Sequence, residues 1–163
     1  MYKRQLDLKT NEADIKEVTQ YFDNLLTCMN SGTEDVPDHP ANVPYFKVTD
    51  FESDYKGIVN YYRRHRCREG YCCKRVNKVL QLCRFNFPFD PCEETRIDVI
   101  TDKDGRESLK LVLKRNDPYV NSHHKGLASV SRSNTDVQAV LDALKVVAYC
   151  ANYVCKPEPK SLF

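Results

Sequence analysis

The chain has 163 residues, of which 41% are hydrophobic and 29% are charged, which allows one compact core but is short for two domains. No run approaches the roughly 18 consecutive apolar residues of a membrane span, and the opening MYKRQLDLKT lacks the apolar run of a signal peptide. We therefore expect a single α+β unit that is nuclear or cytoplasmic, and neither secreted nor held in a membrane.

The net charge of +2 is small, but the charge is unevenly distributed. Residues 1–56 hold 6 basic and 11 acidic side chains, residues 57–84 hold 8 and 1, and residues 85–163 hold 11 and 11. Four aromatic residues lie in or beside the basic segment: Tyr61, Tyr62, Tyr71 and Phe85. Such a mixture is typical of a surface that meets phosphates and stacks on bases. An ordinary solvated basic face has the same charge pattern, so charge alone leaves both interpretations open.

Two helices are predicted in the first third of the chain. Apolar residues recur at helical spacing from Asn11 to Asn30, which predicts one amphipathic helix with an acidic outer face. Residues 31–43 contain glycine and prolines without periodicity and predict a loop, so residues 1–48 form an N-terminal helix and loop. Thr49 and Glu52 then have the spacing of a capping box, and the helix that follows leads into the basic segment.

Eight cysteines occur in a chain without an export signal, which favours reduced thiols, some of them metal ligands, over disulfides. His65, Cys67, either Cys72 or Cys73, and Cys83 supply enough ligands for a tetrahedral Cys₃His zinc site within the basic segment. A zinc ion here would be structural. The remaining cysteines fit no ligand spacing, and we expect them to be small buried thiols: Cys28, Cys92, Cys150 and Cys155.

The second half of the chain predicts a β-hairpin and a long helix. Strand-forming residues flank Asp104-Gly105, which indicates a two-stranded ribbon over residues 95–115. From Asn134 or Thr135 onward, apolar residues at helical spacing predict a helix over residues 135–156. A second stripe lies beside the apolar one: Gln138, Asp142, Lys145, Tyr149, Tyr153 and Lys156. Tyrosines on this polar face favour a functional role, although rings at a helix margin are also common without one.

The spacing Tyr149-x-x-x-Tyr153-x-x-Lys156 resembles the two-tyrosine motif of Helitron-type rolling-circle replication initiators. Blocks similar to those that precede the tyrosines in that family occur in the same order from about Asp50 to Lys160: His65-Arg-Cys67, Tyr71-Cys72, Cys83-Arg-Phe-Asn-Phe-Pro88, Lys114-Arg-Asn-Asp117, Val120-Asn121-Ser-His123 and Asn134-Thr-Asp136-Val-Gln138. The resemblance favours Cys72 over Cys73 as the zinc ligand. It implies an incomplete two-tyrosine endonuclease-like domain over residues 49–163, comprising a basic Cys/His segment (57–92), the hairpin and the tyrosine helix.

In that family a tyrosine hydroxyl attacks a DNA phosphodiester, which leaves a 5′-phosphotyrosine link and a free 3′-hydroxyl, and Mg²⁺ or Mn²⁺ assists. The resemblance therefore implies that Tyr149 and Tyr153 are nucleophile positions, with Lys156 beside them. Gln138 or Asp142 is a candidate ligand for the catalytic metal. The implied partner is single-stranded DNA, contacted by Arg63, Arg64, Arg66, Arg68, Lys74, Arg75, Arg84, Lys114 and Arg115.

The chain also departs from the family. It contains no histidine–hydrophobe–histidine motif to hold the catalytic metal, Ser131 stands where the family has tryptophan, and there is no Walker-type phosphate loop. We therefore expect it to be inactive alone and to depend on a histidine-bearing strand and a helicase domain of a parent protein. Two alternatives stay open, namely a zinc-stabilised single-stranded nucleic-acid-binding module without catalysis and an inert transposon relic.

Overall fold

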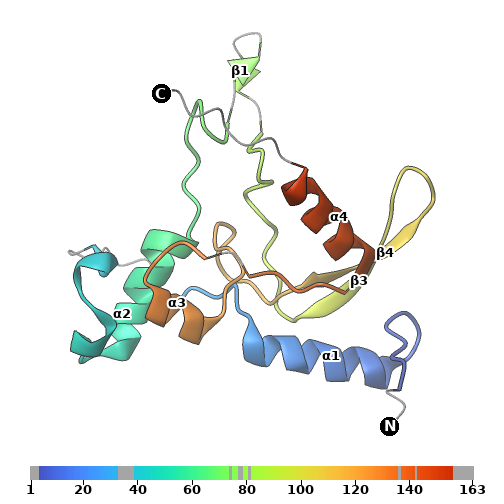
Figure 1. The fold of residues 1–163 in the computed structure, drawn as a ribbon, viewed down its shortest axis with the longest axis horizontal. Coiled ribbons are helices and arrows are strands. Elements are labelled where there is room, and N and C mark those ends of the chain that lie inside the picture. The colour runs from blue at the N-terminus through green and yellow to red at the C-terminus, as the bar shows by residue number, and fades with distance from the viewer. Residues whose placement is uncertain are drawn as a thin grey trace.

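A computed structural model describes residues 4–32, 39–73, 75–76, 79–80, 82–135, 137–141 and 143–155. Helices combine with two small antiparallel sheets in an α+β fold, as expected (Figure 1). The elements in chain order are α1 (Glu12–Leu25), η1 (Pro40–Asn42), η2 (Tyr45–Lys47), α2 (Phe51–Ile58), η3 (Val59–Arg63), β1 (Arg75–Val76), β2 (Val79–Leu80), β3 (Arg96–Thr101), β4 (Glu107–Val112), α3 (Lys125–Ser131) and α4 (Ala143–Val154).

Helix α1 begins where the sequence predicts and ends earlier. The side chain of Asn11 caps it by accepting hydrogen bonds from the backbone N–H groups of Ala13 and Asp14. The predicted end at Asn30 is wrong, because the chain turns extended at Leu26 and Thr27 then pairs with residue 123. Backbone pairing with a distant segment thus overrides the helical periodicity of residues 26–30.

Helix α2 leads into the basic segment through a widened turn. Its cap is Asp50 and not Thr49, because the Asp50 carboxylate accepts from the backbone N–H groups two and three residues on, at 3.2 and 3.1 Å. After Ile58 the chain continues as the π-helix η3, and the N–H of Arg64 donates to the carbonyl of Val59 at 2.8 Å. The predicted delivery of the basic residues by a helix end is confirmed.

The predicted β-hairpin is confirmed as β3 and β4, which pair antiparallel from Arg96 opposite Val112 to Thr101 opposite Glu107. Gly105 supplies the positive φ of +77° that the turn requires. In Figure 1 the ribbon lies between α1 and α4. A second, very short antiparallel pair, β1 with β2, lies at the far end of the basic segment.

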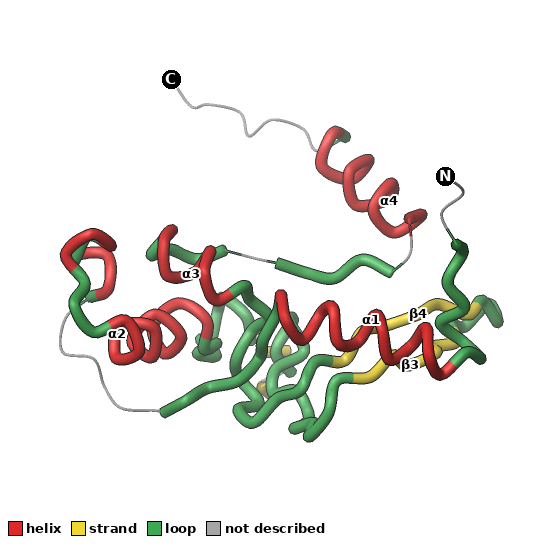
Figure 2. The backbone as a smooth tube through the Cα atoms, turned by 90° about the horizontal axis from the view of Figure 1, so that it is seen from below, coloured by secondary structure: helices red, strands yellow, loops and turns green. Residues whose placement is uncertain are grey.

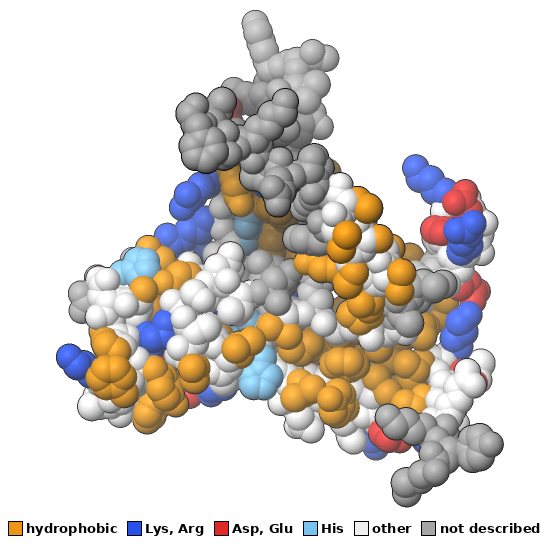
Figure 3. Space-filling view, viewed as in Figure 1, with side chains coloured by type: hydrophobic (Ala, Val, Ile, Leu, Met, Phe, Trp, Pro, Cys, Tyr) orange, Lys and Arg blue, Asp and Glu red, His pale blue; other side chains and the backbone are white. Residues whose placement is uncertain are grey.

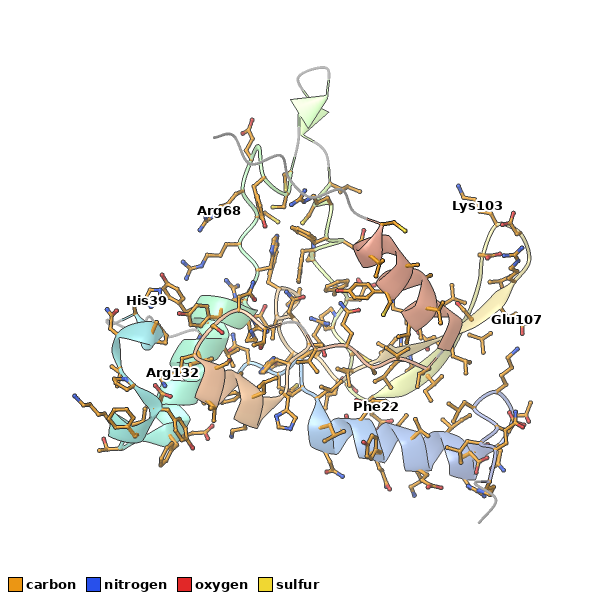
Figure 4. All side chains as sticks on the ribbon, viewed as in Figure 1. Phe22, His39, Arg68, Lys103, Glu107 and Arg132 are labelled. Carbon is orange, nitrogen blue, oxygen red and sulfur yellow. The ribbon has the colours of Figure 1, made fainter. Side chains whose placement is uncertain are left out.

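Helix α3 is an element that the sequence analysis did not predict. It follows a cap at His124, and it ends at Arg132, which adopts a left-handed conformation with φ +47°. The guanidinium of Arg132, labelled in Figure 4, makes two hydrogen bonds of 2.7 Å to the carboxylate of Asp54 on α2. This nearly buried ion pair fixes α3 against α2.

The last helix starts later than predicted. Helix α4 begins at Ala143, and residues 137–141 are not helical. Val137 and Ala139, two residues apart, pack against the cluster of Leu26, Cys28 and Leu113. Val137, the first apolar residue of the predicted stripe, therefore lies in a non-helical segment that packs on this cluster.

The core consists of small separate clusters. One groups Cys72, Cys73, Cys83 and Phe87, a second groups Leu26, Cys28 and Leu113, and a third groups Tyr55, Val59 and Val120. The turned view in Figure 2 shows α4 set apart from the other helices. Among the described residues, no helix is both long and apolar enough to cross a membrane.

Candidate functional site

Four side chains that the sequence singled out as metal ligands converge at one point. The imidazole of His65 and the thiols of Cys67, Cys72 and Cys83 offer ligand atoms that all lie within 4.8 Å of one another. Zinc–ligand bonds of about 2.0–2.3 Å place the corners of a tetrahedron roughly 3.5–3.8 Å apart. The Cys83 Sγ to His65 Nε2 distance of 3.4 Å is close to that spacing. The cluster could therefore hold one metal ion, as the sequence predicted.

A tight turn at residues 68–73 directly follows the candidate ligand Cys67 and contains the candidate ligand Cys72. The backbone N–H groups of Tyr71, Cys72 and Cys73 all point to the carbonyl of Arg68, at 3.0–3.2 Å, and Gly70 supplies the required φ of +79°. The N–H of Arg68 donates to the Sγ of Cys72 at 3.0 Å. Burial works to raise the pKa of the Cys72 thiol, but this N–H and the neighbouring thiols outweigh it and hold the pKa below its usual value. A stabilised thiolate is the form that binds a metal.

His65 is held from two sides. Its backbone N–H donates to the carbonyl of Tyr119 at 2.7 Å, next to the bridge that pairs Arg64 with Val120. Its ring stacks on Phe87, with centroids 4.3 Å apart and planes 11° apart. Burial lowers the pKa of His65, which favours the neutral imidazole that a metal requires.

The cysteines outside the four-residue cluster agree only in part with the expected burial. Cys73 is buried with its Sγ 3.8 Å from that of Cys72, but it lies outside the four-residue cluster, in agreement with the choice of Cys72. Cys28 and Cys92 are buried, as expected of unliganded thiols. Cys150 and Cys155 are exposed on and just after α4, so their expected burial is wrong. Their helix face does not pack into the core.

Three of the predicted DNA-binding arginines surround the metal cluster on the surface. Arg66 and Arg68 flank the candidate ligand Cys67, Arg84 follows the candidate ligand Cys83, and all three are exposed. Figure 3 shows basic side chains gathered at the upper left of the coloured surface, and Figure 4 labels Arg68 on the loop in the same region. The metal cluster and the basic surface are therefore one structural unit.

Other predicted DNA contacts lie elsewhere. Arg63 is 1% exposed, and its guanidinium donates to Asn134 and Thr135, so its predicted contact with DNA is wrong for this conformation. Arg64 pairs with Asp117 at 2.8 Å and lies over the ring of Tyr119. Arg63 thus joins the end of η3 to residues 134–135, and Arg64 joins the residue after η3 to Asp117.

The remaining predicted DNA contacts differ in their exposure to solvent. Lys114 is exposed, whereas Arg115 is partly buried, where it donates to the carbonyl of Val120 and lies 4.7 Å over the ring of Phe89. Lys74 and the side chain of Arg75 lie outside the described residues.

The tyrosine helix is described in part. Tyr149 is 61% exposed on α4, while the side chain of Tyr153, and Asp142 and Lys156 as whole residues, lie outside the described part of the chain. Gln138 is exposed on the segment before α4, so the predicted polar stripe is not continuous on one helix. Gln138 and Tyr149 nevertheless both line a cavity of about 870 Å³ beside the β3–β4 ribbon.

Sequence reasoning missed two charged residues that line the same cavity, Arg96 and Asp98. They form an ion pair at 2.8 Å on strand β3, and the hydrogen bond and attraction of Asp98 raise the pKa of Arg96. Residues two apart on a strand share a face. The alternation of the predicted hairpin was the signal that could have found them.

Several residues from the motif blocks hold the fold together. Asp117 accepts from Asn30 at 3.0 Å and from Arg64, and these bonds keep its pKa below the usual value although burial works to raise it. His123 is fully buried, with its Nε2 2.7 Å from the hydroxyl of Tyr55. The described contacts of these motif residues are structural.

Comparisons of the chain with protein-family models, with curated proteins and with solved structures found no match.

Proposed function

We propose that this chain is the DNA-contacting, tyrosine-bearing part of a Helitron-type rolling-circle initiator. In this proposal a Zn²⁺ ion bound by His65, Cys67, Cys72 and Cys83 fixes a basic surface that binds single-stranded DNA. The observation that carries it is the convergence of these four ligands within 4.8 Å, inside the only strongly basic segment of the sequence.

The donor set favours zinc. Three thiolates and one imidazole are soft or borderline ligands, which suit Zn²⁺ far better than Mg²⁺ or Mn²⁺. Four protein ligands also complete a tetrahedron and leave no position for water, which is the pattern of a structural site. The role of the ion is therefore to fold the loop, and DNA is contacted by the exposed arginines around it.

The resemblance to rolling-circle initiators adds a catalytic role for the parent protein. In that role the hydroxyl oxygen of Tyr149 or Tyr153 attacks phosphorus, the bond to the 3′-oxygen breaks, and that oxygen takes a proton to become a free hydroxyl. The exposure of Tyr149 and its place in the lining of the cavity beside the β3–β4 ribbon are compatible with access by a DNA strand. A phenol attacks a phosphodiester poorly unless a metal or a base activates it. Because the chain contains no histidine–hydrophobe–histidine motif, we expect no nicking by this polypeptide alone.

The binding role is tested with purified protein and a fluorescent single-stranded oligonucleotide. We expect about one equivalent of zinc per chain, and an affinity that falls steeply with salt. Charge reversal at Arg66 and Arg68 should weaken binding, whereas reversal at Arg106, in the loop of the distant β3–β4 hairpin, should leave it nearly unchanged. Folded protein without zinc, or affinity insensitive to salt and to both substitutions, would contradict the proposal.

The catalytic role is tested by incubating single-stranded DNA and Mn²⁺ with the chain, and separately with a version extended by a histidine-bearing strand. Adducts that survive denaturation are expected from the extended protein only. They should disappear when Tyr149 and Tyr153 are both changed to Phe. Adducts that persist in the double variant would overturn the nucleophile assignment, and salt-sensitive binding without any adduct would favour the module without catalysis.

A further inference from the structure

Two exposed aromatic rings and one arginine form a group on the rim of the metal cluster. Tyr71 is 58% exposed and Phe85 is 40% exposed, and their ring centroids lie 6.1 Å apart. The guanidinium carbon of Arg84 lies 4.9 Å from the centroid of Tyr71 and 4.6 Å from that of Phe85. We call these three residues the aromatic bracket.

The metal ligands set the position of the bracket. Tyr71 directly precedes Cys72, and Arg84 and Phe85 directly follow Cys83. The two segments are joined by a hydrogen bond of 2.8 Å from the N–H of Arg84 to the carbonyl of Cys72. A metal ion that draws the two cysteines together therefore also orders the rings beside them.

The rings on the two sides of His65 have different environments. Phe87, which stacks on His65, is 5% exposed and belongs to a core cluster. Phe85, whose ring lies at 77° to that of His65 with centroids 5.8 Å apart, is exposed to solvent together with Tyr71. Single exposed apolar side chains are common, but two rings held together beside exposed arginines are typical of a surface that binds a flat ligand.

The surrounding charge indicates what the ligand carries. Arg66 and Arg68 are exposed on the same loop as Tyr71, and Arg84 is part of the bracket itself. This combination of stacking faces and basic side chains matches single-stranded nucleic acid, whose bases expose their π-faces and whose phosphates are spaced along the chain. Duplex DNA offers the phosphates, but its base faces are already stacked.

We infer that the aromatic bracket stacks on an unpaired base of single-stranded DNA while Arg66 and Arg68 contact the neighbouring phosphates. The inference rests on the proposed function and names the chemical feature that the surface recognises. A base inserted between the two rings would need roughly 7 Å, twice the van der Waals contact distance, so the base stacks on an outer ring face. Arg84 lies over one face of each ring and polarises both.

The test compares a labelled ten-residue thymidine oligonucleotide with an abasic oligonucleotide of the same length and charge, both titrated with the zinc-loaded full chain. We expect the wild type to bind the thymidine strand roughly tenfold more tightly, the scale of one base stacked on an aromatic side chain. Tyr71→Ala and Phe85→Ala should each reduce this ratio, and Tyr71→Phe should keep it. Tyr45→Ala and Phe46→Ala are the matched controls, because both rings are exposed on η2, outside residues 65–87, which contain the metal cluster and the bracket.

The outcomes separate the inference from the proposed function. Salt-sensitive binding of equal strength to both oligonucleotides overturns the bracket and leaves the electrostatic binding role intact. Failure to bind either strand overturns both. A wild-type preference for the base that survives both alanine substitutions also overturns the bracket, as does tighter binding of duplex than of the thymidine strand. Tighter binding of an oligouridine strand would overturn the choice of DNA in favour of RNA.

Discussion

The metal loop (residues 65–87) and helix α4 were both singled out by motifs, yet they differ in how the rest of the chain supports them. In the loop, Cys72, Cys83 and Phe87 are at most 5% exposed, and backbone hydrogen bonds tie the turn to itself and His65 to Tyr119. On α4, Val147 and Val154 are 64% and 84% exposed. In residues 65–87 all four candidate ligands are held by contacts of one short segment and its neighbours. A helix whose apolar side chains remain exposed has few packing contacts and therefore little local stability.

The comparison teaches that the two halves of the proposed function have unequal physical support. A possible metal site is supported by distances and burial within the described chain, whereas the proposed DNA contact rests on the exposure of Arg66, Arg68 and Arg84. Strand transfer is supported by the tyrosine spacing and by the exposure of Tyr149, which are weaker constraints. The experiments below test whether the loop and α4 are energetically as different as they are structurally.

The largest expected effect is the loss of the metal centre. Cys83→Ser should reduce the zinc content to near zero and lower the thermal midpoint, because metal binding free energy stabilises the folded loop. At free zinc a thousandfold above the Kd, the lost contribution is about 4 kcal/mol. Cys150→Ser, which alters an exposed thiol on α4, should change neither zinc content nor thermal midpoint. Metal analysis measures the zinc content and calorimetry measures the thermal midpoint. Equal zinc content in the two variants would contradict the assignment of Cys83 to the metal centre.

A similar contrast is expected for apolar truncation. Phe87→Ala removes a buried ring that stacks on His65, and should cost about 3–5 kcal/mol in the free energy of unfolding. Val147→Ala removes methyl groups that are already in water, and should change stability by about 0.5 kcal/mol or less. Denaturant titration of both variants gives the values. A large loss for Val147→Ala would show that α4 is packed against the body in solution.

Two tyrosine hydroxyls give a smaller matched pair. Tyr55→Phe removes the hydroxyl that lies 2.7 Å from Nε2 of the buried His123, which leaves that nitrogen without its partner and should cost about 1–3 kcal/mol. Tyr21→Phe removes a hydroxyl from a ring that is 59% exposed on α1, and should cost about 0.5 kcal/mol or less. Equal losses in denaturant titration would contradict the structural assignment of His123.

The smallest effect concerns pH. Burial lowers the pKa of His123, and the charge of Arg63 lowers it further, whereas the unfolded chain has a histidine pKa of about 6.5. The unfolded state therefore binds more protons, and stability should fall as the pH drops below about 6.5. His123→Gln should reduce this slope relative to the wild type. Stability measured between pH 7.5 and 5 checks this, and identical slopes in the variant and the wild type would refute it.

Local sequence signals predicted much of the fold. Asn11 begins α1 and Gly105 marks the β3–β4 turn, because capping and positive φ are properties of single residues and their neighbours. The four residues that converge into a possible metal site were also predicted, since His65, Cys67, Cys72 and Cys83 are close in sequence and chemically distinctive. The choice between Cys72 and Cys73 came from the family resemblance, and it agrees with the cluster.

Other features depended on contacts between distant segments. The early end of α1 follows from pairing of Thr27 with His123, and the late start of α4 follows the packing of Val137 and Ala139 on the body. Periodicity alone could predict neither, because an apolar residue can satisfy a helix or an extended segment equally well.

The amino-acid sequence by itself determined which chemistry this protein carries: soft metal ligands, a basic segment and a pair of tyrosines four residues apart. Tertiary structure decided which of those residues can act. It buried Arg63 against Asn134 and Thr135, paired Arg64 with Asp117, and left Arg66, Arg68 and Arg84 on the surface beside Tyr71 and Phe85. Adjacent arginines have the same charge and the same side chain, so their fates differ only through the partners that folding places beside them.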